Sequence, residues 1–271
     1  MADPFKSLRL RESGKVSLAR FDPAHKPFSV GDKDADRTRQ AELSLRLAEL
    51  QDRLYAARRH KLLLVLQGMD TSGKNGTIRS VFQAVDPLGV RAISYKVPTL
   101  LEAEHDFLWR HHRDVPAAGE IVIFNRSHYE AVLVEYVTGT INDAERERRY
   151  GHIRAFEQLL VDSGTTLIKC FLHISKDEQK RRLQQRIDDP DKRWKIDESD
   201  LKSRALWSNY QRAYELALGA TATAQAPWYI VPADSKTHRN LMVTEILLSV
   251  LSELAPAYPP GPASLIGVKV E

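Results

Sequence analysis

The pattern of apolar and polar positions along the chain predicts an α/β fold. An amphipathic helix is expected between about residues 39 and 59, because leucines recur there at helical spacing, at Leu43, Leu47, Leu50 and Leu54. Short apolar runs of β type follow, separated by helical stretches: Leu62 to Leu66, Ala92 to Tyr95, Ile121 to Phe124, Thr166 to Ile174, and Trp228 to Val231. Strands that alternate with helices form βαβ units, so we expect a five-stranded parallel sheet flanked by helices on both faces.

The two ends of the chain differ in pattern from its middle. Residues 1–37 are polar, contain three prolines and show no clear period, which predicts an irregular arm lying on the main domain. Residues 38–255 carry the expected strands and helices and form that domain. Residues 256–271 are rich in Pro and Gly and predict a loosely ordered tail. The leucine stripe of the first helix is too short for a sustained coiled coil, so core packing is favoured over a dimer seam.

Composition narrows the cellular setting and the classes of ligand. The chain has 271 residues with Lys plus Arg at 40 and Asp plus Glu at 36, a net charge of +4 that suits phosphate-rich ligands without implying nucleic acid. The chain start lacks a secretory pattern, and no apolar run approaches the roughly 20 residues that span a bilayer. The one cysteine, Cys170, lies in an apolar run and is interpreted as a core thiol. We therefore expect a cytoplasmic protein that binds neither nucleic acid nor membrane.

A phosphate-binding loop follows the first predicted strand. Gly68 to Lys74 fits the pattern of Gly, four residues, Gly and Lys, directly after an apolar strand and before a helix. Backbone N–H groups of such a loop turn inward to form an anion nest, and the helix N-terminus adds its positive dipole end. Lys74 then supplies a mobile positive charge for the transferred phosphoryl group. The other residues expected to contact phosphates here are Gly68, Met69, Thr71, Ser72, Gly73, Asn75, Gly76 and Thr77.

The expected magnesium ligand departs from the usual pattern. Asn75 stands where a Ser or Thr hydroxyl ordinarily binds magnesium. Asp70 within the loop is the natural replacement, because hard cations prefer carboxylate oxygens and an acid facing a phosphate nest would otherwise repel the ligand. Thr77, as a displaced hydroxyl ligand, is the alternative.

Polar residues cluster where the third predicted strand ends, at the edge of a parallel sheet where ligands bind. Asn125 occupies the position of a metal-binding acid, so direct carboxylate ligation is lost there. Arg126 is placed to neutralise phosphate oxygens; a surface ion pair is the alternative. His128 is interpreted as a structural hydrogen bonder, because transfer to a nucleotide phosphate oxygen needs little proton abstraction.

A basic helix follows the fourth predicted strand. Ser175 to Glu178 reads as a capping box that starts this helix. Arg182 and Arg186 are four residues apart and share one helical face. A lid at about residues 176–200 would close over the phosphates and stabilise charge in the transition state. The alternative is a solvated helix in which Glu178 pairs with Arg182.

These motifs resemble those of polyphosphate kinase family 2, and in particular of its class III. The matching stretches cover most of residues 20–255, and Asn125 to Glu130 is the most specific. The others are Gly68 to Thr77, Val97 to Thr99, Leu108 to Arg110, Lys180 to Leu183, Trp194 to Lys195 and Ala226 to Tyr229. The resemblance implies a P-loop kinase fold similar to thymidylate kinase, a magnesium cofactor, and phosphoryl exchange between inorganic polyphosphate and nucleotides.

The resemblance also implies roles for single residues. The family likewise has an acid at the position of Asp70 and lacks Ser or Thr at the position of Asn75. Four residues in matching stretches are expected to contact the nucleotide or its phosphates: Thr99, Arg110, Asn125 and Glu130. Ala131 differs from an acid often found after the Tyr-Glu pair, so no contact is carried over to the position beyond Glu130.

The sequence therefore predicts a magnesium-dependent phosphotransferase that converts AMP to ADP and ADP to ATP, reversibly, with inorganic polyphosphate as donor. Adenine nucleotides are the expected acceptors, guanine nucleotides are further candidates, and a homo-oligomer is expected. One alternative is an ATP-dependent nucleoside monophosphate kinase, which would need a purine pocket for its donor. The other is a P-loop nucleotide switch or nucleic-acid-binding protein, against which stands the absence of a recognisable nucleic-acid module.

Overall fold

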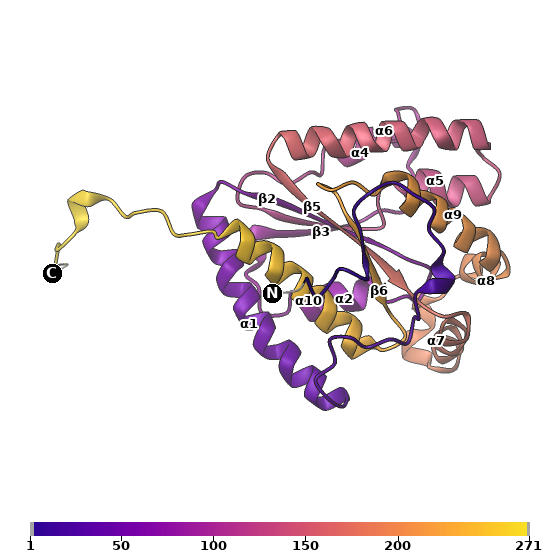
Figure 1. Cartoon of the computed structure of the whole chain (residues 1–271), viewed down its shortest axis with the longest axis horizontal. Helices are drawn as coiled ribbons and strands as arrows, with labels where there is room; N and C mark the ends of the chain where they lie inside the picture. The colour runs from indigo at the N-terminus through magenta and orange to yellow at the C-terminus, as the bar shows by residue number, and fades with distance from the viewer. Residues whose placement is uncertain (1–2, 270–271) are drawn as a thin grey trace.

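A computed structural model of the chain describes residues 3–269 and contains one mixed sheet. Its six strands lie in the order β1-β6-β5-β2-β4-β3 (Figure 1). The strands are β1 Arg9–Leu10, β2 Lys61–Gln67, β3 Val90–Ser94, β4 Ile121–Asn125, β5 Thr165–His173 and β6 Trp228–Pro232. Strands β2 to β6 pair in parallel, as expected, whereas β1 pairs antiparallel to β6.

The prediction of five strands is therefore wrong by one edge strand. Strand β1 belongs to the N-terminal arm and has only two residues, too few to show a period in the sequence. It forms because the outer edge of β6 offers unpaired backbone groups, and Ile230 N donates to Leu8 O at 2.7 Å. The rest of the arm also lies on the main domain, where Phe5, Leu8 and Leu18 are buried.

Helices cover both faces of the sheet. The helices are α1 Lys33–Ala57, α2 Lys74–Val81, α3 Leu100–Ala103, α4 Trp109–His112, α5 Glu130–Val137, α6 Asp143–Asp162, α7 Lys176–Asp188, α8 Glu198–Ala205, α9 Trp207–Thr221 and α10 Lys236–Leu254. Short 3-10 turns occur at Leu18–Arg20, Pro87–Gly89, Pro190–Lys195 and Ala263–Leu265. Helices α1, α2 and α10 pack together on one face, and α5, α6 and α9 pack together on the other (Figure 1). No described helix is long and apolar enough to cross a membrane.

The first helix begins earlier than its leucine stripe indicates. Asp32 caps it, because Asp32 Oδ1 accepts hydrogen bonds from the backbone N–H groups of Asp34 and Ala35 at 2.9 and 2.8 Å. Leu47 and Leu54 are fully buried in this helix, which packs along α10. The stripe is therefore core packing, as expected.

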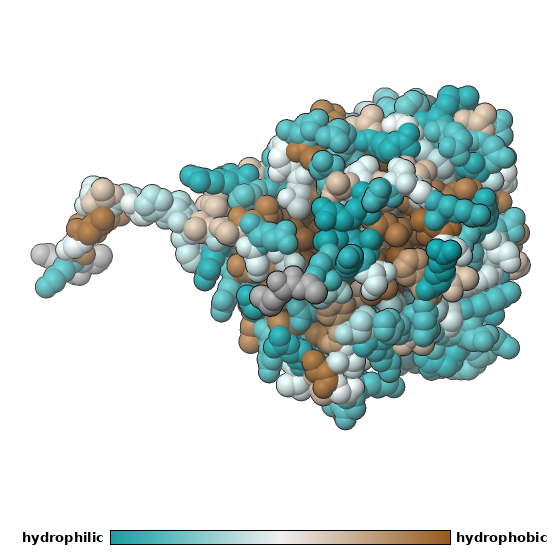
Figure 2. Space-filling model, viewed as in Figure 1, coloured by the Kyte–Doolittle hydropathy of each residue, from teal (hydrophilic) through white to brown (hydrophobic). Residues whose placement is uncertain are grey.

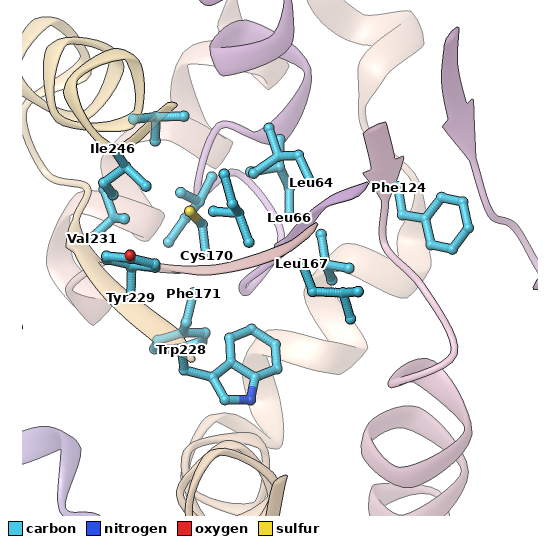
Figure 3. Close-up of a cluster of buried hydrophobic side chains, with 14 of the residues drawn as sticks. Leu64, Leu66, Phe124, Leu167, Cys170, Phe171, Trp228, Tyr229, Val231 and Ile246 are labelled. Atoms are coloured by element: carbon cyan, nitrogen blue, oxygen red, sulfur yellow. The ribbon is translucent and has the colours of Figure 1, made fainter. Parts of the chain in front are cut away.

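The buried core lies around the central strands. Figure 3 shows Cys170 of β5 among Leu64, Leu66, Tyr229 and Ile246 from β2, β6 and α10. Burial raises the pKa of the Cys170 thiol well above its usual range, in agreement with its interpretation as a core residue.

The two ends of the chain lie on the outside of this core. The tail leaves the end of α10 and extends away from the body (Figure 1). The face of the body in Figure 2 is mostly hydrophilic, and the tail carries the exposed apolar residues Leu265 and Ile266. Residues 1 and 2 of the arm and 270 and 271 of the tail lie outside the described residues.

Candidate active site

The phosphate loop lies at the carboxyl end of β2 and has the backbone that an anion nest requires. Gly68 and Gly73 adopt φ values of 151° and 107°. A Cβ on Gly68 would lie 2.7 Å from Leu172 O of β5, so a side chain there would collide with the neighbouring strand. Thr71 is the one other residue of the loop with positive φ, at 64°. The loop thus combines close approach to the sheet with the left-handed backbone that turns N–H groups toward a ligand.

Lys74 begins α2 and bends back over the loop. Its Nζ donates to Gly68 O at 2.6 Å and lies 3.4 Å from Met69 O. Burial, and then the charge of Arg126, lower the pKa of Lys74 to about 8, although Asp70 and Glu130 act in the opposite direction. The lysine therefore carries its charge at neutral pH in surroundings that favour an anionic ligand.

Arg126 pairs with two acids, Asp70 of the loop and Glu130 at the start of α5. Arg126 Nη2 lies 2.8 Å from Asp70 Oδ1, and Arg126 Nη1 lies 3.5 Å from Glu130 Oε2. Arg126 directly follows β4 and has a positive φ of 62°, an uncommon conformation for a residue with a side chain. The structure thus brings together Asp70, Lys74, Arg126 and Glu130.

Two asparagines connect the loop helix with the neighbouring strands. Asn125 Nδ2 donates to Asn75 Oδ1 at 2.6 Å and to Ser94 Oγ at 2.9 Å. These hydrogen bonds link the end of β4 to the first turn of α2 and to the end of β3. Neither side chain carries a charge, so this corner of the site lacks the acid that commonly holds a metal there.

The residues after Arg126 fasten this turn to the protein interior. His128 and Tyr129 are fully buried, and both contact Glu157 Oε1 of α6, Tyr129 OH at 2.7 Å and His128 Nε2 at 3.3 Å. Glu157 Oε2 in turn accepts from Lys169 Nζ at 2.6 Å, and this pair is also buried. His128 is therefore a structural hydrogen bonder, as expected. Glu157 and Lys169 could not be found from the sequence, because they lie on separate elements and match no motif.

Arg182 and Arg186 share one face of α7 but have different surroundings. Arg182 is buried and donates to Thr71 O at 2.9 Å, to Ala233 O at 2.7 Å and to Asp234 O at 2.8 Å. Its Nε also donates to Glu178 at 2.6 Å. The first half of α7 therefore supports the phosphate loop from behind.

Arg186 lies farther along α7 and faces the segment that follows this helix. Arg186 Nη1 donates to Lys195 O at 2.8 Å and lies 3.8 Å from Asp200 Oδ2 of α8. Burial and the nearby charge of Asp70 raise the pKa of Asp200, a third acid near the site besides Asp70 and Glu130. No motif identifies Asp200 in the sequence.

Thr99 and Arg110 lie together near the end of β3. Thr99 caps α3 in a capping box with Glu102. Arg110 Nη1 donates to Lys96 O at 2.9 Å, and its guanidinium lies over the ring of Tyr95, 5.2 Å from the ring centre. Among the described residues neither side chain contacts the phosphate loop directly, and their role in nucleotide binding stays a prediction.

The oxygen atoms of the loop fit a magnesium ion whose remaining coordination positions are filled by oxygens of the bound phosphates. Within residues 3–269 there is no group of three His, Cys, Asp or Glu side chains that could hold a metal by themselves. Magnesium commonly uses one or two carboxylates together with substrate phosphates, and Asp70 supplies one carboxylate here. The hydroxyls of Thr71, Ser72 and Thr77 are buried without a hydrogen-bond partner in the described part of the chain. These are oxygen atoms of the kind that a phosphate or a hydrated cation would use.

A lysine-bearing phosphate loop between a parallel strand and a helix, with an arginine and acids facing it, defines a phosphotransferase of P-loop kinase type. The family model of polyphosphate kinase 2 (PPK2) matches residues 30–257. The chain therefore belongs to the polyphosphate kinase 2 family, whose members are polyphosphate:nucleotide phosphotransferases.

Relatives of full length are similar to this chain. An AMP/ADP-polyphosphate phosphotransferase of Meiothermus ruber is 51% identical over 254 residues, which cover 94% of this chain and 95% of the relative. An ADP-polyphosphate phosphotransferase of Rhodopseudomonas palustris is 40% identical over 94% of this chain and 92% of the relative. The crystal structure of polyphosphate kinase 2 from Arthrobacter aurescens is 44% identical, with a TM-score of 0.91 over 96% of this chain and 93% of that one.

Proposed function

We propose that this protein transfers phosphoryl groups between inorganic polyphosphate and adenine nucleotides, with magnesium, and that it accepts both AMP and ADP. The observation that carries the reaction type is the convergence of Lys74, Arg126 and Asp70 on one anion-binding loop. The name of the Meiothermus ruber relative supports the choice of both acceptors, because that relative is 51% identical across nearly the whole chain.

The chemistry that these residues support is an in-line displacement at phosphorus. An anionic oxygen of the acceptor's terminal phosphate forms the new P–O bond, and the bond to the remaining polyphosphate breaks with its electron pair on the departing oxygen. The attacking oxygen already carries a negative charge, so no general base is required. The loop amides and Lys74 bind the transferring group, and Arg126 stabilises the charge that develops on its oxygens.

Asp70 would hold the magnesium ion, which neutralises phosphate charge and orients neighbouring oxygens when bound. In the free protein the Asp70 carboxylate is paired with Arg126 at 2.8 Å. A cation bound to Asp70 and a phosphate bound to Arg126 would each replace one partner of this ion pair. Metal and donor are therefore expected to assist each other's binding.

The segment after the first half of α7 is the part that would close over the phosphates. Arg186 would supply the lid charge, because within residues 3–269 its polar contacts are with residues 195 and 200 of the same segment and none is with the loop. Glu130 would influence the acceptor through its contact with Arg126, and Thr99 and Arg110 would line the acceptor side. The proposal further includes a thymidylate-kinase-like fold and guanine nucleotides as additional acceptors. It also includes a cytoplasmic location and a homo-oligomer.

The proposed activity is tested by incubating purified protein with ADP and magnesium, with or without long-chain polyphosphate, and by measuring ATP. The proposal expects ATP only when polyphosphate is present. The alternative of an ATP-dependent nucleoside monophosphate kinase is tested with AMP and ATP in the absence of polyphosphate. Rapid ADP formation there, together with no ATP from ADP and polyphosphate, would favour the alternative and contradict the proposal.

A further inference from the structure

Three carbonyl oxygens on the outer side of the phosphate loop are each held by a buried side chain from another element. Gln179 Nε2 of α7 donates to Asp70 O at 3.2 Å. Arg182 Nη1 of α7 donates to Thr71 O at 2.9 Å. Arg239 Nη1 of α10 donates to Ser72 O at 3.0 Å. Helix α10 lies beside α2, so its first turn reaches the loop from behind (Figure 1).

Arg239 makes the shorter of two side-chain hydrogen bonds that fix the direction of one backbone N–H group. A peptide unit is planar and trans, so the N–H of a residue points away from the carbonyl of the residue before it. The Ser72 carbonyl accepts from Arg239 Nη1 at 3.0 Å and, more weakly, from Arg182 Nη1 at 3.3 Å. The Gly73 N–H of the same peptide therefore points to the opposite side, where a phosphate would lie. A Cβ on Gly73 would lie 1.8 Å from Arg239 Nη1, so this arrangement requires glycine at position 73.

The charge of Arg239 is not neutralised by an acid. Arg239 is 2% exposed, and among the described residues its other donors contact only the amide oxygen of Asn240, at 2.8 and 3.2 Å. Within residues 3–269 it forms no ion pair, whereas the neighbouring Arg182 pairs with Glu178. Burial, and then the charge of Arg182, lower the pKa of Arg239 to about 9, so it stays charged at neutral pH.

A buried positive charge without a counter-charge destabilises a protein unless something of opposite sign comes near it. The hydrogen bonds of Arg239 go to neutral oxygens, which leaves its charge available to an anion on the other side of the loop. Because the intervening space is protein rather than water, this attraction is screened less than it would be at the surface.

We propose that Arg239 is a positioning residue for phosphoryl transfer, which orients the Ser72–Gly73 peptide and adds positive potential beneath the bound phosphates. This inference rests on the proposed function, since it takes a polyphosphate-like anion as the ligand of the loop. Two properties of one side chain are involved, its charge and its hydrogen bond to Ser72 O. They can be separated by substitution.

The test measures binding of inorganic tripolyphosphate by titration calorimetry without nucleotide, and kcat with ADP and polyphosphate. Arg239→Gln keeps a donor but removes the charge, and we expect its tripolyphosphate affinity to fall about tenfold. Arg239→Lys keeps the charge but not the planar fork, and we expect its affinity to stay within about threefold while kcat falls about tenfold. The control is Arg146→Met, which removes a buried arginine of α6 and should leave both quantities unchanged.

A purely structural role for Arg239 would lower the melting temperature of its variants without changing anion affinity or kcat per folded molecule. If Arg239→Gln bound tripolyphosphate like the unaltered protein, the inference would be overturned while the proposed function stood. If Arg239→Gln did not fold, Arg239→Lys would decide, because an unchanged kcat in that variant also overturns the inference. If the unaltered protein bound no tripolyphosphate and formed no ATP from ADP and polyphosphate, the proposed function itself would fail, and this inference with it.

Discussion

Asn125 Nδ2 donates a hydrogen bond to Asn75 Oδ1 at 2.6 Å, which joins the end of β4 to the first turn of α2. In P-loop enzymes these two positions ordinarily carry an acid and a hydroxyl that hold magnesium. Here both are neutral amides that satisfy each other. The carboxylate for a metal must then come from another residue, and Asp70 lies in the loop itself.

Replacing Asp70 is expected to change the magnesium requirement. Asp70→Asn keeps the shape of the side chain but removes the charge that attracts the cation. We expect the magnesium concentration for half-maximal velocity to rise about tenfold, measured at saturating ADP and polyphosphate. Asp143→Asn, an acid of α6 away from the loop, serves as the control. An unchanged magnesium titration for Asp70→Asn would assign the metal to other ligands.

Lys74 is expected to give the reaction a basic limb in its pH profile. The pKa of Lys74 is lowered to about 8, so the charged form is present below this pH and is lost as pH rises through it. We expect kcat/KM for polyphosphate to fall above about pH 8, since this ratio reports the free enzyme. Nucleotide phosphates ionise near pH 6 and are constant across this window. Lys74→Arg should move the limb upward, and a limb that stays in place would assign it to another group.

Alanine substitutions of Arg182 and Arg186 are expected to affect different properties, stability for Arg182 and kcat for Arg186. Arg182→Ala removes the donor that Arg182 supplies to the buried carbonyls of Thr71, Ala233 and Asp234, so the free energy of unfolding should fall by about 3 kcal/mol, although Glu178 keeps its pair with Arg181. Arg186→Ala should leave stability within about 0.5 kcal/mol but lower kcat about tenfold or more, because its charge would act in the closed state. Chemical denaturation and steady-state kinetics measure the two quantities. An unchanged kcat in Arg186→Ala would show that this part of α7 is a solvated helix with no role in transfer.

The buried pair of Lys169 and Glu157 is expected to stabilise the turn that carries Arg126. Lys169→Met leaves Glu157 as an uncompensated buried charge, so the free energy of unfolding should fall by about 3–5 kcal/mol. Arg148→Met, which breaks a more exposed pair with Glu145, should cost at most about 1 kcal/mol. Equal losses in the two variants, measured by urea denaturation, would contradict a special role for the buried pair.

The parallel strands and the loop could be predicted because their signals are local. Residues 62–66 form a continuous apolar run, and the glycine and lysine spacing that follows it is set by the backbone of the loop itself. The leucine spacing also predicts α1, although this helix begins where Asp32 caps it and not at the first leucine. Strand β1 has too few residues to leave a pattern.

The support of the site could not be predicted because it depends on tertiary contacts. Arg239 contacts a loop residue that lies 167 positions away in the sequence, and nothing near it marks it as different from other arginines. Arg182 looked equivalent to Arg186 by helical spacing, since spacing defines a shared face but not what that face packs against. Asp200 likewise comes near Asp70 only through the fold of α8.

The acceptor range tests the central claim most directly. Purified protein is incubated with AMP, magnesium and long-chain polyphosphate as sole donor, and nucleotides are separated by ion-exchange chromatography over time. Lys74→Ala, prepared in parallel, controls for contaminating adenylate kinase, and its turnover should be lower by about 100-fold or more. The account predicts that ADP appears first and ATP follows, and that both form at least about 100-fold more slowly in the control. If ADP were converted to ATP while AMP stayed untouched, the proposed acceptance of both nucleotides would be wrong, and if neither reacted, the proposed activity would be contradicted.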